Sequence, residues 1–334
     1  MKKPIPTRFV RTTTLALGSL LALAAPCALA TAAQPVLVPG PVVEIGASAG
    51  KFDFLEVDSV HHRLLAAHEK DDTADFIDLD TNKLITRLKL GSVVHTIIDP
   101  TTDRYYCSAQ GEQTVVVLNA ADFKELARVK LDGELDALLL VPKHGRVYAA
   151  HDNGTHLWAV DTATDKPVGE VAIPGAPELM VYDAAADRIY LNIKTANEVV
   201  VIDPNTDKII AHWATAPAVS PHGLVLDAAR QRVYVAGGNG VLAAIDVKTG
   251  RVVASTDIAK NVDQAAFDAK AGRVYCAGQE QLSVVEASDA GLKTLGSVPT
   301  NTTARNVAVD PRTGAVWTTY VEGGKAYAKS WLRP

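Results

Sequence analysis

Seven polar side chains recur at nearly even intervals along the chain, each where an apolar, strand-like run begins. They are Asp53, His95, Asp136, Glu178, His222, Asp263 and Arg305. Carboxylates favour a cationic or polyhydroxylated group, whereas an arginine can hold a carboxylate or a phosphate in a bidentate hydrogen bond. If the fold brings these residues together, they predict a ligand-binding site.

Histidines add a second chemistry to this set. Imidazole together with carboxylate is a suitable shell for Zn, Cu, Fe or Ni, and Asp136 or Glu178 could supply the carboxylate. The candidate metal ligands are His68, His95, His151 and His222. No HxH or HExxH spacing supports them, and they come from separate parts of the chain. The alternative is a polar channel mouth that holds only water.

One repeated unit must position these residues. Its signature is Asp-x-x-x-x-Arg, followed by an apolar residue and then an aromatic one. Copies begin at Asp58, Asp99, Val141, Asp183, Asp227, Asp268 and Asp310. Six intervals separate Asp58 from Asp310, which gives a mean period of 42 residues. A period of this length without helical periodicity is typical of a propeller blade.

Each copy contains four strand-like runs separated by turns, so the sequence predicts an all-β fold. That fold is a seven-bladed β-propeller with four antiparallel strands per blade. The seventh copy supplies three strands, and Pro41–Gly46 resembles the missing outer strand. We therefore expect the N-terminal strand to close the last blade, which removes an open sheet edge. The domain is predicted to span 35–334, without a linker or a second domain.

Most repeated residues are expected to be structural. The repeat arginine should cap its own hairpin beside the preceding aspartate, and the aromatic residue should pack between blades. Cys107 and Cys276 follow this aromatic residue in non-neighbouring blades, too far apart for a disulfide, so two buried free thiols are expected. His61 and His62 fall in a turn and are expected at the surface.

Tyr190–Pro204, which reads YLNIKTANEVVVIDP, resembles the YVTN β-propeller repeat, and Tyr234–Asn239 is a shorter match. With its leader, the chain is similar to YncE-like exported proteins. This resemblance implies the fold far more strongly than a chemistry. Seven-bladed relatives include proteins without a known reaction, lactonases and subunits of periplasmic redox enzymes, so function must be argued from the site.

Strand alternation predicts which residues share a face of the propeller. The connections from strand four to strand one and from strand two to strand three lie together around the central channel. The seven residues named first should line its mouth. The second set of connections adds His68, Glu69, Gln110, Glu112, His151, Asp152, His156, Asn192, Asn239, Gln279, Glu280 and Tyr320. Five of the nine histidines map to this face.

Residues 1–30 have the form of a secretory signal peptide. Lys2, Lys3, Arg8 and Arg11 precede a short apolar run, and Ala28-Leu29-Ala30 offers a cleavage site. The run is shorter than the ~20 residues of a membrane span. Removing residues 1–30 moves the formal charge of the chain from −5 to −9, because this segment carries four positive charges and no negative ones. An acidic surface argues against nonspecific binding to nucleic acid.

The sequence therefore predicts a monomeric binding or scaffold protein, periplasmic or secreted. A small molecule or a protein partner would bind at a histidine-rich channel mouth. The first alternative is a metal-dependent hydrolase of the lactonase type, with a transition metal as cofactor. The second is an accessory subunit of a periplasmic redox system. P-loop, CxxCH and CxxC patterns are absent from the sequence.

Overall fold

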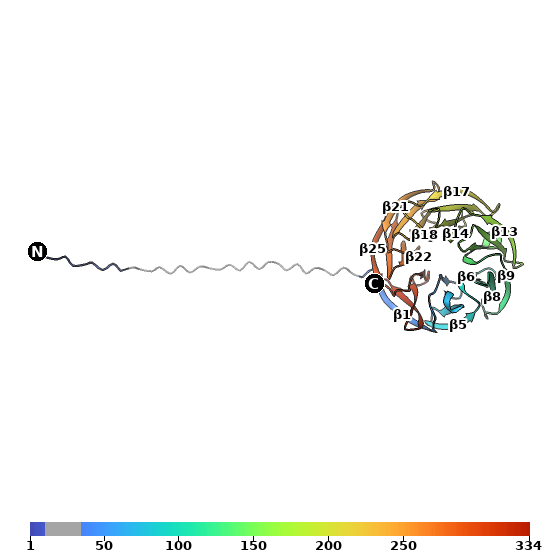
Figure 1. The fold of residues 1–334 in the computed structure, drawn as a ribbon, viewed down its shortest axis with the longest axis horizontal. Coiled ribbons are helices and arrows are strands. Elements are labelled where there is room, and N and C mark those ends of the chain that lie inside the picture. The colour runs from blue at the N-terminus through green and yellow to red at the C-terminus, as the bar shows by residue number, and fades with distance from the viewer. Residues whose placement is uncertain (11–34) are drawn as a thin grey trace. The chain divides into compact units, whose positions relative to one another are not determined.

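Seven four-stranded antiparallel sheets form a ring of blades in the computed structural model (Figure 1). The structure describes residues 1–10 and 35–334, and Pro35–Pro334 form one compact unit. The predicted signal peptide, residues 1–30, lies largely outside the described residues. None of the helices in these two ranges is long and apolar enough to cross a membrane. The predicted fold class is confirmed.

Each blade contributes one strand to each of four concentric layers, and the first strands lie innermost (Figure 1). The inner strands are β2 (Leu55–Asp58), β6 (Val93–Asp99), β10 (Leu135–Val141), β14 (Pro177–Asp183), β18 (Pro221–Asp227), β22 (Val262–Asp268) and β26 (Ala308–Val309). The second strands are β3 (Arg63–His68), β7 (Arg104–Ala109), β11 (Arg146–His151), β15 (Arg188–Ile193), β19 (Arg232–Gly237), β23 (Arg273–Gly278) and β27 (Val316–Glu322).

The third and fourth strands continue each blade outward. The third strands are β4 (Thr73–Asp78), β8 (Thr114–Asn119), β12 (His156–Asp161), β16 (Glu198–Asp203), β20 (Val241–Asp246), β24 (Gln281–Ser288) and β28 (Lys325–Leu332). The outer strands are β5 (Lys83–Lys89), β9 (Glu125–Lys130), β13 (Lys166–Ala172), β17 (Lys208–Ala214), β21 (Arg251–Asp257), β25 (Gly291–Pro299) and β1 (Val38–Ala47). Two short 3-10 helices, η1 (Glu69–Asp71) and η2 (Pro142–His144), lie in loops.

The seventh blade joins the two ends of the domain. Strand β1 pairs antiparallel with β28, from Val38 opposite Leu332 to Ala47 opposite Lys325. The expectation that an N-terminal strand completes this blade is therefore confirmed. Because the sheet is completed in this way, the last blade has the same four strands as the other six.

The burial of each strand follows its place in the blade. In the fourth blade, β16 is buried at its four central residues, whereas β17 alternates between exposed and half-buried positions. Strands with both faces covered read as continuous apolar runs, and strands with one wet face alternate. The repeat tyrosines Tyr148, Tyr190 and Tyr234 are buried within the apolar clusters, as expected.

The repeat arginine does not cap its own hairpin in the first two blades, which corrects the expectation from sequence. Arg63 Nη1 donates to Ala120 O at 2.6 Å, and Arg104 Nη1 donates to Thr162 O at 3.2 Å. Both acceptors lie in the next blade, so the arginine links neighbouring blades. The repeat aspartate caps the turn instead: Asp183 Oδ1 accepts from two backbone N–H groups.

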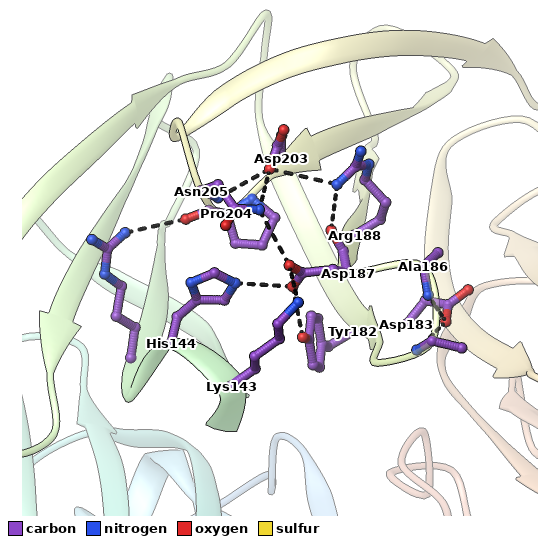
Figure 2. A network of polar contacts seen from close by, with 12 residues as sticks. Lys143, His144, Tyr182, Asp183, Ala186, Asp187, Arg188, Asp203, Pro204 and Asn205 are labelled. Carbon is purple, nitrogen blue, oxygen red and sulfur yellow. Dashed lines mark hydrogen bonds and ion pairs between the residues drawn. The ribbon is translucent and has the colours of Figure 1, made fainter.

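A polar network also links the third and fourth blades (Figure 2). Asp187 lies in the turn after β14 and accepts hydrogen bonds from Lys143 Nζ at 2.7 Å and His144 Nε2 at 2.9 Å. The Tyr182 hydroxyl donates to the same carboxylate at 2.8 Å. The hydrogen bond from Lys143, opposed by partial burial and assisted by His144, holds the pKa of Asp187 well below its usual range. This cluster therefore acts as a clamp between blades.

Candidate ligand-binding site

A polar cavity of about 320 Å³ lies at the mouth of the channel, and we call it the mouth cavity. It is lined by Lys51, Asp53, Phe54, Glu69, Gln110, Asp136, Asp152, Glu178, Lys194, His222, Asp263 and Arg305. Six of the seven residues that the sequence singled out therefore meet in one place. The structure also brings Glu69, Gln110 and Asp152 there, from the connections expected to share this face.

A shared position in the repeat explains this convergence. Each of the six residues lies five positions before the first residue of the repeat signature, as Asp136 precedes Val141 and Glu178 precedes Asp183. In β10, β14, β18 and β22 it is the second residue of the inner strand, beside a register shift. Such bulges bend a strand and can redirect a side chain, here into the channel mouth.

His95 is not brought to the mouth cavity, and its register gives the reason. It lies four residues before Asp99, so Val94 is the true counterpart of Asp136. A shift of one residue turns a side chain to the other side of a strand. His95 is 2% exposed, and its Nδ1 accepts a hydrogen bond from Leu138 N at 3.0 Å. It therefore links the inner strands of the second and third blades.

Gln264 occupies the same register position in the sixth blade and has a similar role. Its Oε1 accepts from Leu55 N and Val307 N, both at 3.1 Å, and its Nε2 donates to Leu55 O at 2.7 Å. One buried amide therefore connects the inner strands of the first, sixth and seventh blades. This layer of bridging side chains supports the ring of polar residues above it.

Each cationic side chain in the mouth cavity, histidine aside, contacts a carboxylate. The pairs are Lys51 with Glu69 at 2.7 Å, Lys194 with Glu178 at 2.6 Å and Arg305 with Asp263 at 3.4 Å. His222 Nε2 lies 3.7 Å from Glu178 Oε1. Gln110 Nε2 donates to Asp152 at 3.1 Å. The cavity thus holds six carboxyl groups and three lysine or arginine groups.

Asp136 is the carboxyl group of the mouth cavity that has no partner. Its side chain has no hydrogen bond or ion pair with any residue of the described ranges, although the residue is only 8% exposed. Burial, followed by the charges of Glu178, Asp53 and Asp152, raises the pKa of Asp136 well above its usual range. A buried carboxylate without a partner is costly, so an approaching cation would stabilise the ionised form of this group.

Neighbouring carboxyl groups are perturbed in the same direction. Burial and the nearby charge of Asp263 raise the pKa of Asp53 to about 8, although Lys51 opposes the shift. Burial also raises the pKa of Glu178 despite the favourable charges of His222 and Lys194. Clustered groups with perturbed pKa values are typical of functional sites, although ion-pair networks can produce them too.

A second hollow of about 570 Å³ adjoins the mouth cavity, because His222 and Arg305 line both. Its other lining residues are Ser220, Gly238, Asn261, Val262, Gln279, Glu280 and Thr302. These residues come from loops of the fifth, sixth and seventh blades, except for Val262, which begins β22. A ligand that is too long for the mouth cavity could therefore extend outward on this side.

The remaining metal candidates lie in separate surroundings. His68 is fully buried, stacks on Phe52 and has its Nδ1 2.9 Å from Asp75. His151 packs against His156 and Trp158. Only His222 of the four lines the mouth cavity, which is rich in carboxylates rather than histidines. Across residues 1–10 and 35–334, no group of three or more His, Cys, Asp or Glu side chains could hold a metal ion.

The inner half of the channel is different in character. A cavity of about 580 Å³ is lined mainly by aliphatic inner-strand residues, including Leu138, Met180 and Val225. It extends to Ser59 and Pro311, which lie in turns between first and second strands. These turns belong to the face opposite the mouth cavity. The channel therefore has one polar end and one largely apolar end.

Two lysines of the mouth cavity were missed by the sequence reasoning. Lys194 directly follows β15, in a connection between second and third strands, and the same rule that selected Asp152 would have selected it. Lys51 lies two residues before Asp53, in the loop that enters the first blade. Nothing local distinguishes this lysine from the other surface lysines of the chain.

Comparisons with known proteins support the propeller class. No family model matches the sequence. Protein NirF of Stutzerimonas stutzeri is 24% identical over 122 residues, which is 36% of this chain, and the match spans only 30% of the length of NirF. The fold is similar to a chain of the Kuenenia stuttgartiensis hydrazine synthase structure, with a TM-score of 0.74, 14% identity and coverage of 85% of this chain and 96% of that one.

A chain in a crystal structure of the mitotic checkpoint complex is also similar. Its TM-score is 0.77 at 12% identity, and the match covers 97% of this chain and 99% of that chain. At these identities the two structural likenesses show the fold alone. The activity of this chain must therefore be argued from its own residues.

Proposed function

We propose that this chain is an exported binding or scaffold protein of the YVTN-repeat type, which holds a small molecule or a polar group of a partner protein in the mouth cavity. The observation that carries the proposal is the convergence of six polar side chains, which lie at or just before the inner strands of six blades. Export rests on the leader-like residues 1–30, and the repeat type rests on the sequence of Tyr190–Pro204.

Stability alone gives no reason for this ring of charges. Gln264 and the contacts of His95 connect the blades in the layer beneath it. Burying carboxyl groups with raised pKa values costs free energy of folding, and apolar residues would pack there without that cost. A polar concave site at the end of a channel is a common place for ligands.

The two other functional classes stay predictions. A metal-dependent hydrolase of the lactonase type would need a bound metal, and a redox accessory subunit would need a cofactor-bearing partner. Within the described ranges, no group of three or more His, Cys, Asp or Glu side chains could hold the metal that the hydrolase would need.

Thermal denaturation with a chemically sorted panel tests the proposal. The panel contains organic cations, carboxylates and phosphates, neutral sugars and transition-metal salts, all at one ionic strength. We expect at least one class to raise the melting temperature of the wild type, because a ligand that binds only the folded state stabilises it. Asp136→Asn and Arg305→Ala should remove that shift.

Asp289→Asn is the matched control, because this side chain is 95% exposed and lies outside the mouth cavity. It should respond to the panel as the wild type does. A panel in which no class stabilises the wild type would contradict the proposal. So would a shift of equal size in the wild type and both mouth variants.

A further inference from the structure

The mouth cavity holds more carboxyl groups than lysine and arginine groups, so a bound cation would be favoured there. We propose that the ligand is a small organic cation whose ammonium or guanidinium group pairs with Asp136. This inference rests on the proposed function, because it names the chemical class that the same cavity binds. It is carried by the position, burial and missing partner of one side chain.

Asp136 enters the cavity from the start of β10, and the described part of the chain offers it no hydrogen bond or ion pair. Lys194, the cation whose charge acts on Asp136, already lies 2.6 Å from Glu178. Lys51 and Arg305 contact Glu69 and Asp263 in the same manner. The protein's own cations are therefore committed to other carboxylates, and Asp136 remains open to a ligand.

The groups that face Asp136 favour a positive ligand. Glu178 on β14, Asp53 before β2 and Asp152 after β11 add negative charge, and Lys194 after β15 is the one cation among them. An anion would meet several carboxylates before it met an uncommitted cation. A positive ligand would relieve the repulsion between these carboxyl groups as well as pair with Asp136.

An organic cation fits better than a metal ion. A bound transition metal needs about four ligands at 2.0–2.3 Å, whereas no group of three ligating side chains stands close enough among the described residues. The volumes of about 320 Å³ and 570 Å³ leave space for a molecule rather than a single ion. His222 and Arg305, at the junction of the two spaces, could contact its polar tail.

Proton release should accompany binding. Asp136 must be ionised to attract a cation, and burial beside other acids raises the pKa of this carboxyl group. The ligand therefore displaces a proton, and its affinity should rise with pH until Asp136 is ionised without it. A cation bound at an exposed surface carboxylate would release no proton near neutral pH.

Calorimetric titration of the purified protein tests this inference. The probes are 1,4-diaminobutane, tetramethylammonium and methylguanidinium, with succinate and glucose as probes of the other classes. At least one cation should bind the wild type at pH 7, and Asp136→Asn should weaken it at least tenfold. Titration in two buffers with different ionisation heats should show proton release that this variant loses. Asp289→Asn should keep both the affinity for the cation and the proton release.

The outcomes separate this inference from the proposal on which it rests. Binding of succinate or glucose, lost in Arg305→Ala, would overturn the cationic ligand and leave a binding protein. Cation binding that survives in Asp136→Asn would also overturn it. If no probe of any class binds and the broader panel gives no thermal shift, both proposals fail. A circular-dichroism spectrum matching the wild type would show that Asp136→Asn is folded.

Discussion

The imidazole of His62 in the first blade lies 2.9 Å, through Nε2, from the carboxylate of Asp310 in the seventh blade. Its Nδ1 lies 2.8 Å from Asp80. The sequence placed His62 in a surface turn, but the residue is 4% exposed, which corrects that expectation. Burial opposes protonation, yet the hydrogen bonds to Asp310 and Asp80 outweigh it and raise the pKa of His62. First and last blades are thus held by a buried ion pair.

His62→Ala should lower the free energy of unfolding by about 2 kcal/mol at pH 5.5, because it leaves Asp310 without its partner. A group whose folded-state pKa is raised stabilises fully below its unfolded value of about 6.5, and this stabilisation is lost as the pH rises through the folded value. The deficit should therefore shrink at pH 9. Urea denaturation at both pH values measures it, with the exposed His212→Ala as control. An equal deficit at both pH values would show that the ion pair contributes nothing.

Asp53 should make stability fall as the pH rises. Its folded pKa of about 8 lies above the ordinary value, so the folded state binds more protons than the unfolded state between about pH 4 and pH 8. Asp53→Asn should remove about 4 kcal/mol of this loss in the free energy of unfolding between pH 5 and pH 8.5. Denaturant midpoints of both proteins across that range are the measurement. If the midpoints of the wild type and of Asp53→Asn changed in parallel with pH, the expectation would be wrong.

Gln264→Ala should destabilise the domain by about 2–4 kcal/mol, because the N–H groups of Leu55 and Val307 would lose their shared acceptor in a buried layer. Gln281→Ala, at the exposed first residue of β24, is a matched control and should change stability by less than about 0.5 kcal/mol. Urea denaturation of both variants measures the difference. A small effect at Gln264 would mean that neighbouring groups replace its contacts.

Cys107 and Cys276 should be inert toward thiol reagents in the folded protein. Both are fully buried free thiols, as the sequence predicted, and burial raises the pKa of Cys107 to about 12 and that of Cys276 further. The thiolate is the reactive form, so neither residue should be modified by an aromatic disulfide reagent at pH 8. Peptide mass mapping after native and denatured labelling reads this out. Rapid labelling of either residue in the native protein would contradict the burial seen here.

The architecture could be predicted from sequence because it repeats. Asp183, Arg188 and Tyr190 recur with local spacing, and local spacing decides strands, turns and the number of blades. The mouth residues could be found by the same count, five positions before each signature. His95 was misplaced because it was aligned by residue type, whereas strict counting leads to Val94. One position decides which way a side chain faces.

Other features could not be read from the chain. His62 meets Asp310 only after the ring closes, and Lys51 meets Glu69 through a loop rather than a strand. Arg63 reaches Ala120 in the next blade, although its own turn lies closer in sequence. Such contacts depend on how blades pack, which no periodic pattern encodes. That Asp136 lacks a partner becomes evident only when the contacts of its neighbours are known.

Closure of the seventh blade also has a consequence for how the chain acquires its shape. The ion pair between Glu44 on β1 and Lys325 on β28 spans 281 positions, and the strands it joins pair with each other along their length. During synthesis β1 has no partner until nearly the whole domain has followed it. High contact order of this kind slows folding and leaves a strand edge open to wrong pairing in the meantime. The first strand to be synthesised, β1, is therefore among the last to pair with its neighbour.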